Sequence, residues 1–270
     1  MEASPPAAVG EPILELRSVS RLFGGLAAVS GLDLEVPRGS IFGLIGPNGA
    51  GKTTVFNLIT GATPPTSGKV FFEGRETTGL PAYAINRLGI ARTFQNIRLF
   101  KEVTVADNVR TAGSWRAGYG WLQGLIQGSG FAQREAELSE KVHRLLVAFG
   151  LEHRGSELAR SLPYGEQRRL EIARALATGP RLLLLDEPAA GLNAAETDEL
   201  MALVHRLREE YDLTILLIEH DMRLVMRICQ RICVLDHGEK ICEGPPDEVR
   251  TDPRVIAAYL GQETTDASDQ

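Results

Sequence analysis

Long hydrophobic runs are absent from this 270-residue sequence. No run approaches the roughly 18–20 apolar residues that a membrane-spanning helix needs. Residues 1–12 are rich in Ala and Pro and lack both a basic start and an apolar stretch, so they do not match a secretory signal. We expect no membrane span, and we expect residues 1–12 and 262–270 to be loose, disordered tails.

An excess of positive charge is also absent. The 29 Lys and Arg residues are outnumbered by 35 Asp and Glu residues, which gives a net charge of −6. This balance argues against a nucleic-acid binder that depends on general basicity, although it does not exclude a local basic patch. We therefore expect no nucleic-acid partner.

Cysteine is scarce. The three residues, Cys229, Cys233 and Cys242, match no zinc spacing, and their odd number fits a reducing cytosol. We interpret them as small apolar side chains, with a redox or metal-binding role as the alternative. The remaining composition, with 24% charged and 43% hydrophobic residues, is that of an ordinary globular protein of one or two domains.

A glycine-rich loop lies between an apolar run, Ile41–Ile45, and a predicted helix, Lys52–Thr60. It fits the phosphate-binding pattern G-x-x-x-x-G-K-[ST] in its strand–loop–helix setting. Glycine permits the tight curl that points backbone N–H groups at an anion, and the helix adds a partial positive charge. The predicted binding residues are Gly46, Pro47, Asn48, Gly49, Ala50, Gly51, Lys52, Thr53 and Thr54.

Within this loop, Lys52 is expected to reach the β- and γ-phosphates of a nucleotide. The Thr53 hydroxyl is expected to hold Mg²⁺, and Thr54 to donate a further hydrogen bond. The alternative is a Gly-rich turn before an ordinary helix. The Lys-Thr pair and the buried-type strand before the loop argue against that alternative.

Strand and helix patterns alternate in the last third of the chain. Continuous apolar runs that end in acidic residues occupy Arg181–Asp186, Thr214–Glu219 and Ile232–Asp236, as is typical of parallel strands covered on both faces. Helical patterns at Ala194–Tyr211 and Met222–Ile228 separate them, which predicts right-handed crossovers and a mostly parallel sheet. Ligands of such sheets bind at the carboxyl ends of the strands. We therefore expect the acidic strand ends and the phosphate loop to converge.

Alternating patterns near the start of the chain predict half-buried strands at Ile13–Leu22 and Leu26–Val36 and an edge strand at Lys69–Phe72. Phe23 stands at the end of the first strand. It is either an aromatic that lies against an adenine ring or a core residue, and its spacing alone does not decide between them.

Residues 96–178 are mostly helical in pattern, and the apolar spacing within Phe131–Phe149 is near-helical. This predicts a helical subdomain inserted into an α/β core. Inside it, residues 113–130 are rich in Gly and include Trp115 and Trp121, which fits either a contact surface for an apolar partner or a flexible loop. The predicted divisions are residues 13–95 for the first part of the core, 96–178 for the helical subdomain and 179–261 for the second part of the core.

Two carboxylates, Asp186 and Glu187, follow a run of four leucines. We expect Asp186 to orient Mg²⁺ and Glu187 to activate water, and acid–base assistance of this kind typically contributes about 10²–10⁴ in rate. His220 follows another strand end and is either a donor to a γ-phosphate or a structural histidine. Gln95, at the junction with the helical subdomain, can touch both Mg²⁺ and the water. Asp236 is interpreted as a cap or a solvated charge.

A second helix start suited to an anion lies in residues 161–169, where Gly165 stands just before a strongly patterned helix. One chain that carries two phosphate-seeking helix starts suggests that two chains sandwich a nucleotide between them.

Taken in order, these features resemble those of the ATP-binding cassette (ABC) ATPases over roughly Ile13–Gly261. The resemblance implies an α/β fold: a P-loop NTPase (RecA-like) core with a mostly parallel sheet, an antiparallel β edge and an inserted α-helical subdomain. It implies that Phe23 stacks on adenine, that Glu187 polarises the attacking water and that His220 contacts the γ-phosphate. With these come Gln95 and Lys52 as catalytic residues and Thr53, Gln95 and Asp186 as metal ligands. The implied signature, which completes the ATP site of the opposite subunit, comprises Leu162, Pro163, Tyr164, Gly165, Glu166 and Gln167.

The chain departs from the family pattern in the signature and at Asn193. The signature usually reads Leu-Ser-Gly-Gly-Gln, and here Pro163 and Tyr164 replace Ser and the first Gly. The Ser hydroxyl is therefore missing, while Gly165 and its neighbouring amides remain. Asn193 stands where many members have Asp, which predicts an altered contact across the dimer.

A narrower resemblance is to the larger ATPase subunit of branched-chain amino acid importers. ATPases of urea or short-amide importers and of lipopolysaccharide exporters look similar. The exporter-type segment Thr-x-Val-Gly-Glu-x-Gly is absent before the signature, where Arg154–Ser161 does not match it, and this favours import. The segments that carry the resemblance are Arg92–Phe100, Tyr164–Arg174, Pro188–Asn193 and Ala258–Gly261.

The resemblance implies a peripheral ATPase on the cytoplasmic face of a bacterial membrane that uses ATP and Mg²⁺ in a head-to-tail cassette dimer. Its expected partners are two transmembrane permease subunits, a second ATPase subunit and, indirectly, a substrate-binding protein. The permeases would dock in a groove near Gln95–Val105.

Two other classes are alternatives. A soluble ABC ATPase of translation or DNA repair usually carries two cassettes or a long coiled-coil insertion, and this chain has one cassette and a short insertion. A non-enzymatic nucleotide sensor is disfavoured by the presence of Glu187, Gln95 and His220.

Overall fold

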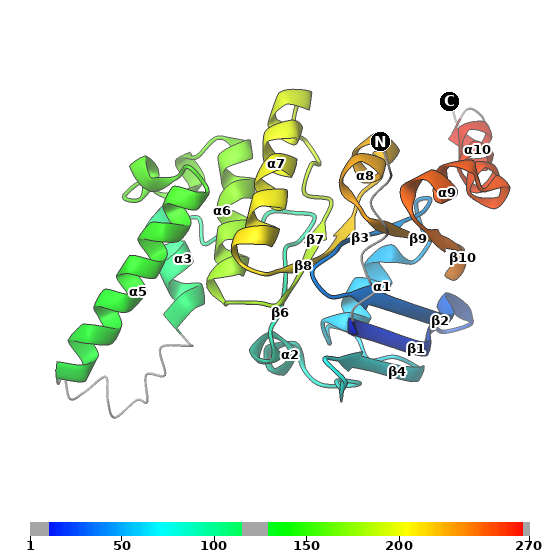
Figure 1. Ribbon diagram of the computed structural model, residues 1–270, viewed down its shortest axis with the longest axis horizontal. Helices are drawn as coiled ribbons and strands as arrows, with labels where there is room; N and C mark the ends of the chain where they lie inside the picture. Colours follow the sequence, from blue (N-terminus) through cyan, green and yellow to red (C-terminus); the bar gives the residue numbers. More distant parts are fainter. Residues whose placement is uncertain (1–10, 115–128, 267–270) are drawn as a thin grey trace, which may run out of the picture. The chain divides into compact units, whose positions relative to one another are not determined.

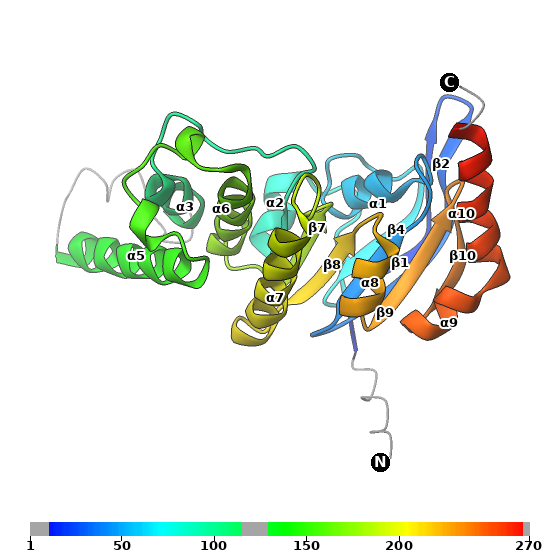
Figure 2. The ribbon, with the colours of Figure 1, turned by 90° about the horizontal axis from the view of Figure 1, so that it is seen from above.

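The computed structural model describes residues 11–114 and 129–266, which form two compact units (Figure 1, Figure 2). Unit 1 consists of the described residues up to Ile85 and from Arg208 onward, and unit 2 consists of those from Asn86 to Leu207. The chain passes between the units within two helices, α2 and α7. The α/β architecture with strands of both orientations confirms the predicted fold class.

Unit 1 contains most of the strands. Its elements are β1 (Pro12–Phe23), β2 (Leu26–Pro37), β3 (Ile41–Ile45), α1 (Lys52–Ile59), β4 (Ser67–Phe72), β5 (Arg75–Glu76), the start of α2 (Ala82–Leu88), β8 (Thr214–Ile218), α8 (Met222–Ile228), β9 (Arg231–Asp236), β10 (Glu239–Gly244), α9 (Pro246–Thr251) and α10 (Pro253–Asp266). Figure 2 shows α9 and α10 after β10 at the end of this unit, and α9 packs on both α8 and β10.

The antiparallel sheet of unit 1 has the strand order β2-β1-β4-β5. In β1 and β2 the buried residues alternate roughly with exposed ones, as expected for strands with one face on the core. Leu14 and Leu16 of β1 face Val36 and Leu34 of β2 in the antiparallel register. These strands confirm the half-buried strands that the alternating pattern predicted.

The second sheet of unit 1 is built around β3, which pairs in parallel with both β8 and β9, while β10 pairs antiparallel with β9. All five residues of β3 are buried, as in a strand covered on both faces. At Gly43 the missing side chain lets α8 approach, because a Cβ there would lie 3.1 Å from both Cys229 Sγ and Val225 Cγ1. The glycine in this strand therefore sets how closely strand and helix pack.

Unit 2 contains the helical segment and two parallel strands. Its elements are β6 (Ile90–Arg92), α3 (Val105–Ser114), α5 (Ser129–Ala148), the 3₁₀ turns η2 (Glu152–Arg154) and η3 (Ala159–Ser161), α6 (Tyr164–Ala177), β7 (Leu182–Asp186) and most of α7 (Ala194–Glu210). Helix α3 packs on both α5 and α6, which lie side by side in Figure 1. The core between these helices includes Val109, Leu145 and Phe149, each nearly inaccessible to solvent.

Several elements differ from the sequence-based expectation. The short strand β6 had no assignment, and it exists because it pairs in parallel with β7. Residues 86–95 and 179–207 belong to unit 2 together with the helical segment, and the predicted domain divisions stay a prediction. The elements from β10 to α10 were not assigned either, and α10 extends to Asp266, into the segment predicted to be a loose tail. Trp115 and Trp121 lie outside the described residues, so the interpretation of that stretch stays a prediction.

Across residues 11–114 and 129–266, no helix has the length and apolar character that crossing a membrane requires.

The leucine run of β7 should be important for stability. Leu184 is fully buried, so Leu184→Ala should lower the free energy of unfolding by about 2–5 kcal/mol through lost burial and the cavity left behind. Urea unfolding followed by circular dichroism measures this. The control is Leu26→Ala, because Leu26 is 72% exposed and its loss should change stability by less than about 0.5 kcal/mol. Equal unfolding midpoints for the two variants would contradict the assignment of β7 to the core.

All three cysteines are free thiols, and Cys229 and Cys233 are buried. Burial raises the pKa of Cys229 to about 12 and raises the pKa of Cys233 well above its usual range. Burial, with a hydrogen bond to Asp252, also raises the pKa of the partly exposed Cys242. Protonated, covered thiols fit the interpretation of Cys229 and Cys233 as apolar side chains.

Alkylation should therefore be selective in the native protein. Iodoacetamide at pH 8 should modify Cys242 first, because this thiol is partly exposed, but slowly, because its pKa is raised. Cys229 and Cys233 should react only after unfolding. Peptide mass spectrometry of timed samples measures each rate. Labelling in guanidinium chloride is the control, and fast native labelling of Cys229 or Cys233 would overturn the prediction.

Candidate nucleotide site

The predicted site residues divide between the two units. Unit 1 holds Phe23, the phosphate loop and His220. Unit 2 holds Gln95, the pair Asp186 and Glu187, and the signature segment 162–167.

The phosphate loop curls tightly between β3 and α1. Gly46, Gly49 and Gly51 have φ angles of 149°, 79° and 100°, which favour glycine. A Cβ at Gly46 would lie 2.1 Å from the carbonyl oxygen of Leu235, so no side chain fits there. Lys52 is buried, and its Nζ donates to the carbonyl oxygens of Gly46 at 2.6 Å and of the next residue at 2.7 Å. The result is a cradle of backbone groups with an ammonium at its edge, which suits a chain of phosphates.

A neighbouring hairpin turn supports the loop. Gly238, in the turn between β9 and β10, donates its N–H to Ala50 O at 3.1 Å and accepts the Ser30 N–H at 2.9 Å. The φ angles of His237 and Gly238 are 45° and 82°, as a two-residue hairpin turn of the primed type requires. The sequence analysis missed this contact, because its partners are far apart in the chain. The available signal was the His-Gly pair after an apolar strand.

Phe23 and His220 are both exposed. Phe23 is 49% accessible at the end of β1, so the alternative that it is a core aromatic is wrong. The guanidinium of Arg21 lies 4.5 Å from the centre of its ring. His220 follows β8, and the next residue, Asp221, caps the start of α8 with its carboxylate. Both side chains can therefore be reached from solvent.

Glu187 stands directly after β7 in a strained backbone conformation. Its φ of 48° is in the left-handed region, which costs a non-glycine residue on the order of 1–3 kcal/mol and is frequent at functional sites. Its side chain is buried, and Gln95 Nε2 donates to Glu187 Oε2 at 2.8 Å. The structure thus brings Gln95 and Glu187 together. A buried carboxylate whose orientation is fixed by an amide can accept a proton from water.

Asp186, the last residue of β7, is buried with only one of its carboxylate oxygens paired. Arg92 Nη2 donates to Asp186 Oδ2 at 2.7 Å, whereas Asp186 Oδ1 accepts no hydrogen bond from the described part of the chain. Thr93 Oγ1 accepts the backbone N–H of Asp186 at 3.3 Å. Mg²⁺ prefers carboxylate oxygens, so the unpaired Oδ1 fits a magnesium ligand. Thr53, another predicted ligand, is exposed in the first turn of α1.

The signature segment forms the start of α6. Pro163 is the residue before the helix, and its carbonyl oxygen accepts the N–H of Gln167 at 2.9 Å. Gln167 Nε2 donates to Leu162 O at 2.8 Å, so this side chain is occupied within its own segment. Tyr164 begins the helix and is 45% exposed. A side chain at Gly165 would approach Glu196 Oε1 to 3.3 Å.

Asn193, where many members of the resembling family have Asp, caps α7. Its Oδ1 accepts the N–H of Glu196 at 3.0 Å, and Glu196 Oε2 accepts the N–H of Asn193 at 2.9 Å. This reciprocal pair is a capping box. The residue therefore has a local structural role that the sequence analysis did not assign.

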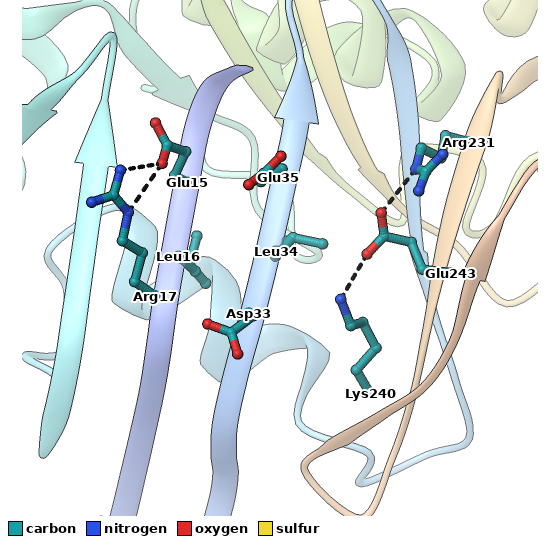
Figure 3. Close-up of a pocket in the computed structure, with 9 residues that line it drawn as sticks. All are labelled: Glu15, Leu16, Arg17, Asp33, Leu34, Glu35, Arg231, Lys240 and Glu243. Atoms are coloured by element: carbon teal, nitrogen blue, oxygen red, sulfur yellow. Dashed lines mark hydrogen bonds and ion pairs between the residues drawn. The ribbon is translucent and has the colours of Figure 1, made fainter. Parts of the chain in front are cut away.

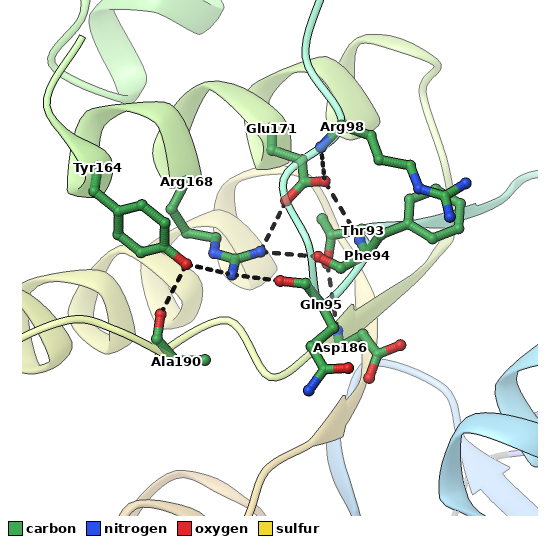
Figure 4. A network of polar contacts seen from close by, with 9 residues as sticks. All are labelled: Thr93, Phe94, Gln95, Arg98, Tyr164, Arg168, Glu171, Asp186 and Ala190. Atoms are coloured by element: carbon green, nitrogen blue, oxygen red, sulfur yellow. Dashed lines mark hydrogen bonds and ion pairs between the residues drawn. The ribbon is translucent and has the colours of Figure 1, made fainter. Parts of the chain in front are cut away.

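A buried charge network lies behind Gln95 (Figure 4). Arg168 of α6 is fully inaccessible, and its guanidinium donates to the carbonyl oxygens of Phe94 and Gln95 at 2.9 and 3.0 Å. It also donates to Glu171 Oε2 at 2.9 Å, while Glu171 Oε1 accepts the N–H groups of Phe94 and Arg98. Burial raises the pKa of Glu171, and the two amides and Arg168 oppose that effect. The sequence analysis missed both residues, because a charged pair three residues apart on a helix usually faces solvent.

A hollow of about 590 Å³ in unit 1 is lined by residues of β1, β2, β9 and β10 (Figure 3). Five of its seven charged residues pair with one another: Arg17 with Glu15 at 2.6 Å, and Glu243 with both Arg231 and Lys240 at 2.8 Å. None of the predicted site residues lines it, and the pairing leaves little net charge to select a ligand. We assign no function to this hollow.

The C-terminal helix reaches the phosphate loop. The hydroxyl of Tyr259, on α10, is buried, and the nearby backbone of Gly46 interacts with it. Burial raises the pKa of Tyr259 to about 12, and the Gly46 backbone opposes that rise. The segment Ala258–Gly261 entered the sequence analysis only through a family resemblance, and the structure places part of it against the loop.

Comparison with known protein families identifies two matching segments. Residues 29–190 match the model of the ABC transporter family, and residues 239–264 match that of the branched-chain amino acid ATP-binding cassette transporter. The second segment corresponds to β10, α9 and most of α10, the part of unit 1 that includes Tyr259.

Curated relatives match nearly the whole chain. The high-affinity branched-chain amino acid transport ATP-binding protein BraF of Pseudomonas aeruginosa is 47% identical over 94% of this chain and 100% of its own length. The protein of the same description named LivG from Escherichia coli is 45% identical, with the same coverage.

Solved structures show the same fold. The ADP conformation of MJ1267, an ATP-binding cassette of an ABC transporter, has a TM-score of 0.80 at 32% identity and covers 93% of this chain and 99% of its own. The dimeric structure of MJ0796, a bacterial ABC transporter cassette, has a TM-score of 0.74 at 26% identity and covers 86% and 98%. With a cradle for phosphates, a buried carboxylate at a strand end and these relatives along its length, the chain belongs to the ABC transporter family, as an ATP-binding cassette with ABC-type ATPase activity.

Proposed function

We propose that this protein is the ATP-hydrolysing subunit of an importer for branched-chain or other amino acids. The observation that carries the proposal is the hydrogen bond between Gln95 and Glu187, because it supplies an oriented carboxylate in a cassette whose relatives serve such transporters. The match of residues 239–264 to the branched-chain amino acid model supports the cargo class.

In this proposal the site residues divide the tasks toward ATP among them. Phe23 stacks on the adenine ring, and the backbone of residues 46–54 together with Lys52 binds the phosphates. Glu187 accepts a proton from the attacking water, Gln95 holds the carboxylate in place, and His220 donates to the γ-phosphate. The exposed positions of Phe23 and His220 and the burial of Lys52 and Glu187 support these roles.

We assign magnesium binding to Thr53, Gln95 and Asp186. Asp186 supports this most directly, because its Oδ1 is buried and unpaired within the described residues. When bound, the ion would neutralise phosphate charge. The pair with Arg92 would orient the Asp186 carboxylate for that task.

The signature segment would act on a second nucleotide, held by another cassette in a head-to-tail dimer. The start of α6 offers free N–H groups and a partial positive charge, which suit a phosphate. A bacterial cassette of similar fold is dimeric in its solved structure, which supports this arrangement. The second cassette is either a copy of this chain or a related subunit.

The membrane partners would be two permease subunits, reached from the cytoplasmic face of a bacterial membrane, with a substrate-binding protein acting indirectly. Phe100 and Val103 support a docking surface near Gln95–Val105, because they are 52% and 37% exposed although apolar. Urea or amide import and lipopolysaccharide export remain the alternatives within the family.

The role of Glu187 has a direct test. Glu187→Gln should bind ATP normally and lower its hydrolysis at least about 100-fold, because an amide cannot accept the proton. Steady-state phosphate release measures the rate and a fluorescent ATP analogue measures the affinity. Glu210→Gln, on the exposed end of α7, is the matched control. Hydrolysis near the normal rate in Glu187→Gln would remove Glu187 as the base.

The phosphate loop has a separate test. Lys52→Ala should weaken ATP binding about 10-fold or more, since hydrogen bonds to a charged group contribute roughly 1.5–3 kcal/mol. Calorimetric titration measures the affinity. Lys69→Ala is the control, because Lys69 is an exposed residue of β4 paired with Glu76. Unchanged affinity in Lys52→Ala would refute the role.

The transport assignment is tested by partner capture. Tagged Glu187→Gln protein with ATP, isolated from its native cell in mild detergent, should bring two multi-span proteins and a second small ATPase or further copies of itself. Mass spectrometry identifies them. Recovery of ribosomal or DNA-associated proteins instead would favour a soluble ABC ATPase.

A further inference from the structure

Tyr164 is the residue that replaces the first Gly of the usual signature, and its hydroxyl joins α6 to the turn after β7 (Figure 4). The hydroxyl lies 3.1 Å from Ala190 O and 3.2 Å from Arg168 Nη2. A carbonyl cannot donate and a guanidinium cannot accept, so the single hydroxyl proton goes to Ala190 and a lone pair receives Arg168. The direction of both bonds is therefore fixed by the chemistry of the partners.

The backbone after Glu187 is shaped to receive this ring. Gly191 has a φ of 79°, and a Cβ there would lie only 3.0 Å from Tyr164 Cε1. Ala190 N–H in turn donates to Glu187 O at 3.1 Å, so the turn that holds the Tyr164 hydroxyl also contains Glu187. A tyrosine at the signature and a glycine in this turn are thus complementary in shape.

Arg168 continues the connection on the other side. The same Nη2 that donates to Tyr164 donates to Gln95 O, and Gln95 Nε2 reaches Glu187. Arg168 is fully buried and paired with Glu171, so its position is fixed by contacts rather than by solvent. Tyr164 is therefore linked to Glu187 through Ala190 and to Gln95 through Arg168.

We propose that Tyr164 and Arg168 are positioning residues. They hold Gln95 and Glu187 at hydrogen-bond distance, and they make that geometry depend on the position of the start of α6. The inference rests on the proposed function, since it assumes that Glu187 is the base. Tyr164 is 45% exposed, so a partner cassette that contacts the signature would press on the same side chain. The replacement of glycine by tyrosine then gives the signature a direct link to the catalytic pair of its own chain.

The test is Tyr164→Phe, which keeps the ring and removes the two hydrogen bonds. We expect kcat for ATP to fall about 10-fold, with KM and nucleotide affinity within about 2-fold of the parent, because no phosphate-loop residue is touched. Hydrogen–deuterium exchange without nucleotide supplies a readout independent of activity. Exchange should become faster in peptides that cover residues 94–98 and 187–192, where the amides of Phe94, Arg98 and Ala190 are bonded.

Two further variants complete the design. Arg168→Lys keeps the charge but cannot reach all four acceptors at once, so it should show the same exchange pattern with a larger loss of kcat. Combined with Tyr164→Phe, it should lower kcat by less than the product of the separate effects, because both act through one connection. Tyr83→Phe is the matched control, since Tyr83 is 67% exposed on α2 and should leave rate and exchange unchanged.

The results of Tyr164→Phe and Glu187→Gln together separate this inference from the proposed function. Parental kcat in Tyr164→Phe overturns the inference, provided that Glu187→Gln in the same assay has lost hydrolysis. A lower kcat with unchanged exchange at both peptides also overturns it, because Tyr164 would then act on the opposite nucleotide and not on Gln95 and Glu187. Persistent hydrolysis by Glu187→Gln removes the proposed function itself, whereas faster exchange in both peptides of Tyr164→Phe still establishes the mechanical connection.

Discussion

The burial of one guanidinium constrains much of unit 2. A charge away from water must be surrounded by acceptors, and Arg168 finds them in two backbone carbonyls, a carboxylate and a hydroxyl. Those acceptors belong to α6 and to the loop that follows β6, so Arg168 joins these two segments. The Gln95–Glu187 hydrogen bond joins the same loop to the end of β7, and the positioning role that we propose for Arg168 rests on this arrangement.

In unit 1 the phosphate loop depends on backbone conformation. The phosphate loop needs curled amides, and its glycines have conformations that other residues rarely adopt. Gly238, in the turn between β9 and β10, and Tyr259, on α10, approach the loop, so elements near the C-terminus brace a motif near the start of the chain. Tyr259 lies within residues 239–264, which match a family model of branched-chain amino acid cassettes. One contact to the phosphate loop therefore comes from the segment that this model covers.

Much of the fold could be predicted from the pattern of apolar and polar residues in the sequence. The boundaries of β3 and α8 agree with prediction to the residue, because a short apolar run before a glycine loop and an apolar helix after a capping Asp leave little choice. The strand β6 and the elements after β9 could not be predicted in this way. β6 has only three residues and the later segments have no clear pattern, so both acquire their structure from a neighbouring strand or helix. Phe23 illustrates the same limit: its sequence allowed a core position, and the structure exposes it.

The sequence by itself determined the chemistry: a phosphate loop with Lys52 and Thr53, two carboxylates after a buried strand, a glutamine and a histidine. These follow from residue type and local spacing, because a turn or a strand end presents its own side chains. Only the tertiary structure decided that Gln95 holds Glu187, that Asp186 keeps one oxygen unpaired, and that Arg168 is buried beneath Tyr164. Such contacts join segments about 70 to 90 residues apart in the chain, as the pairs Arg168–Gln95 and Gln95–Glu187 show. A local pattern contains no information about which distant group will fill the space beside it.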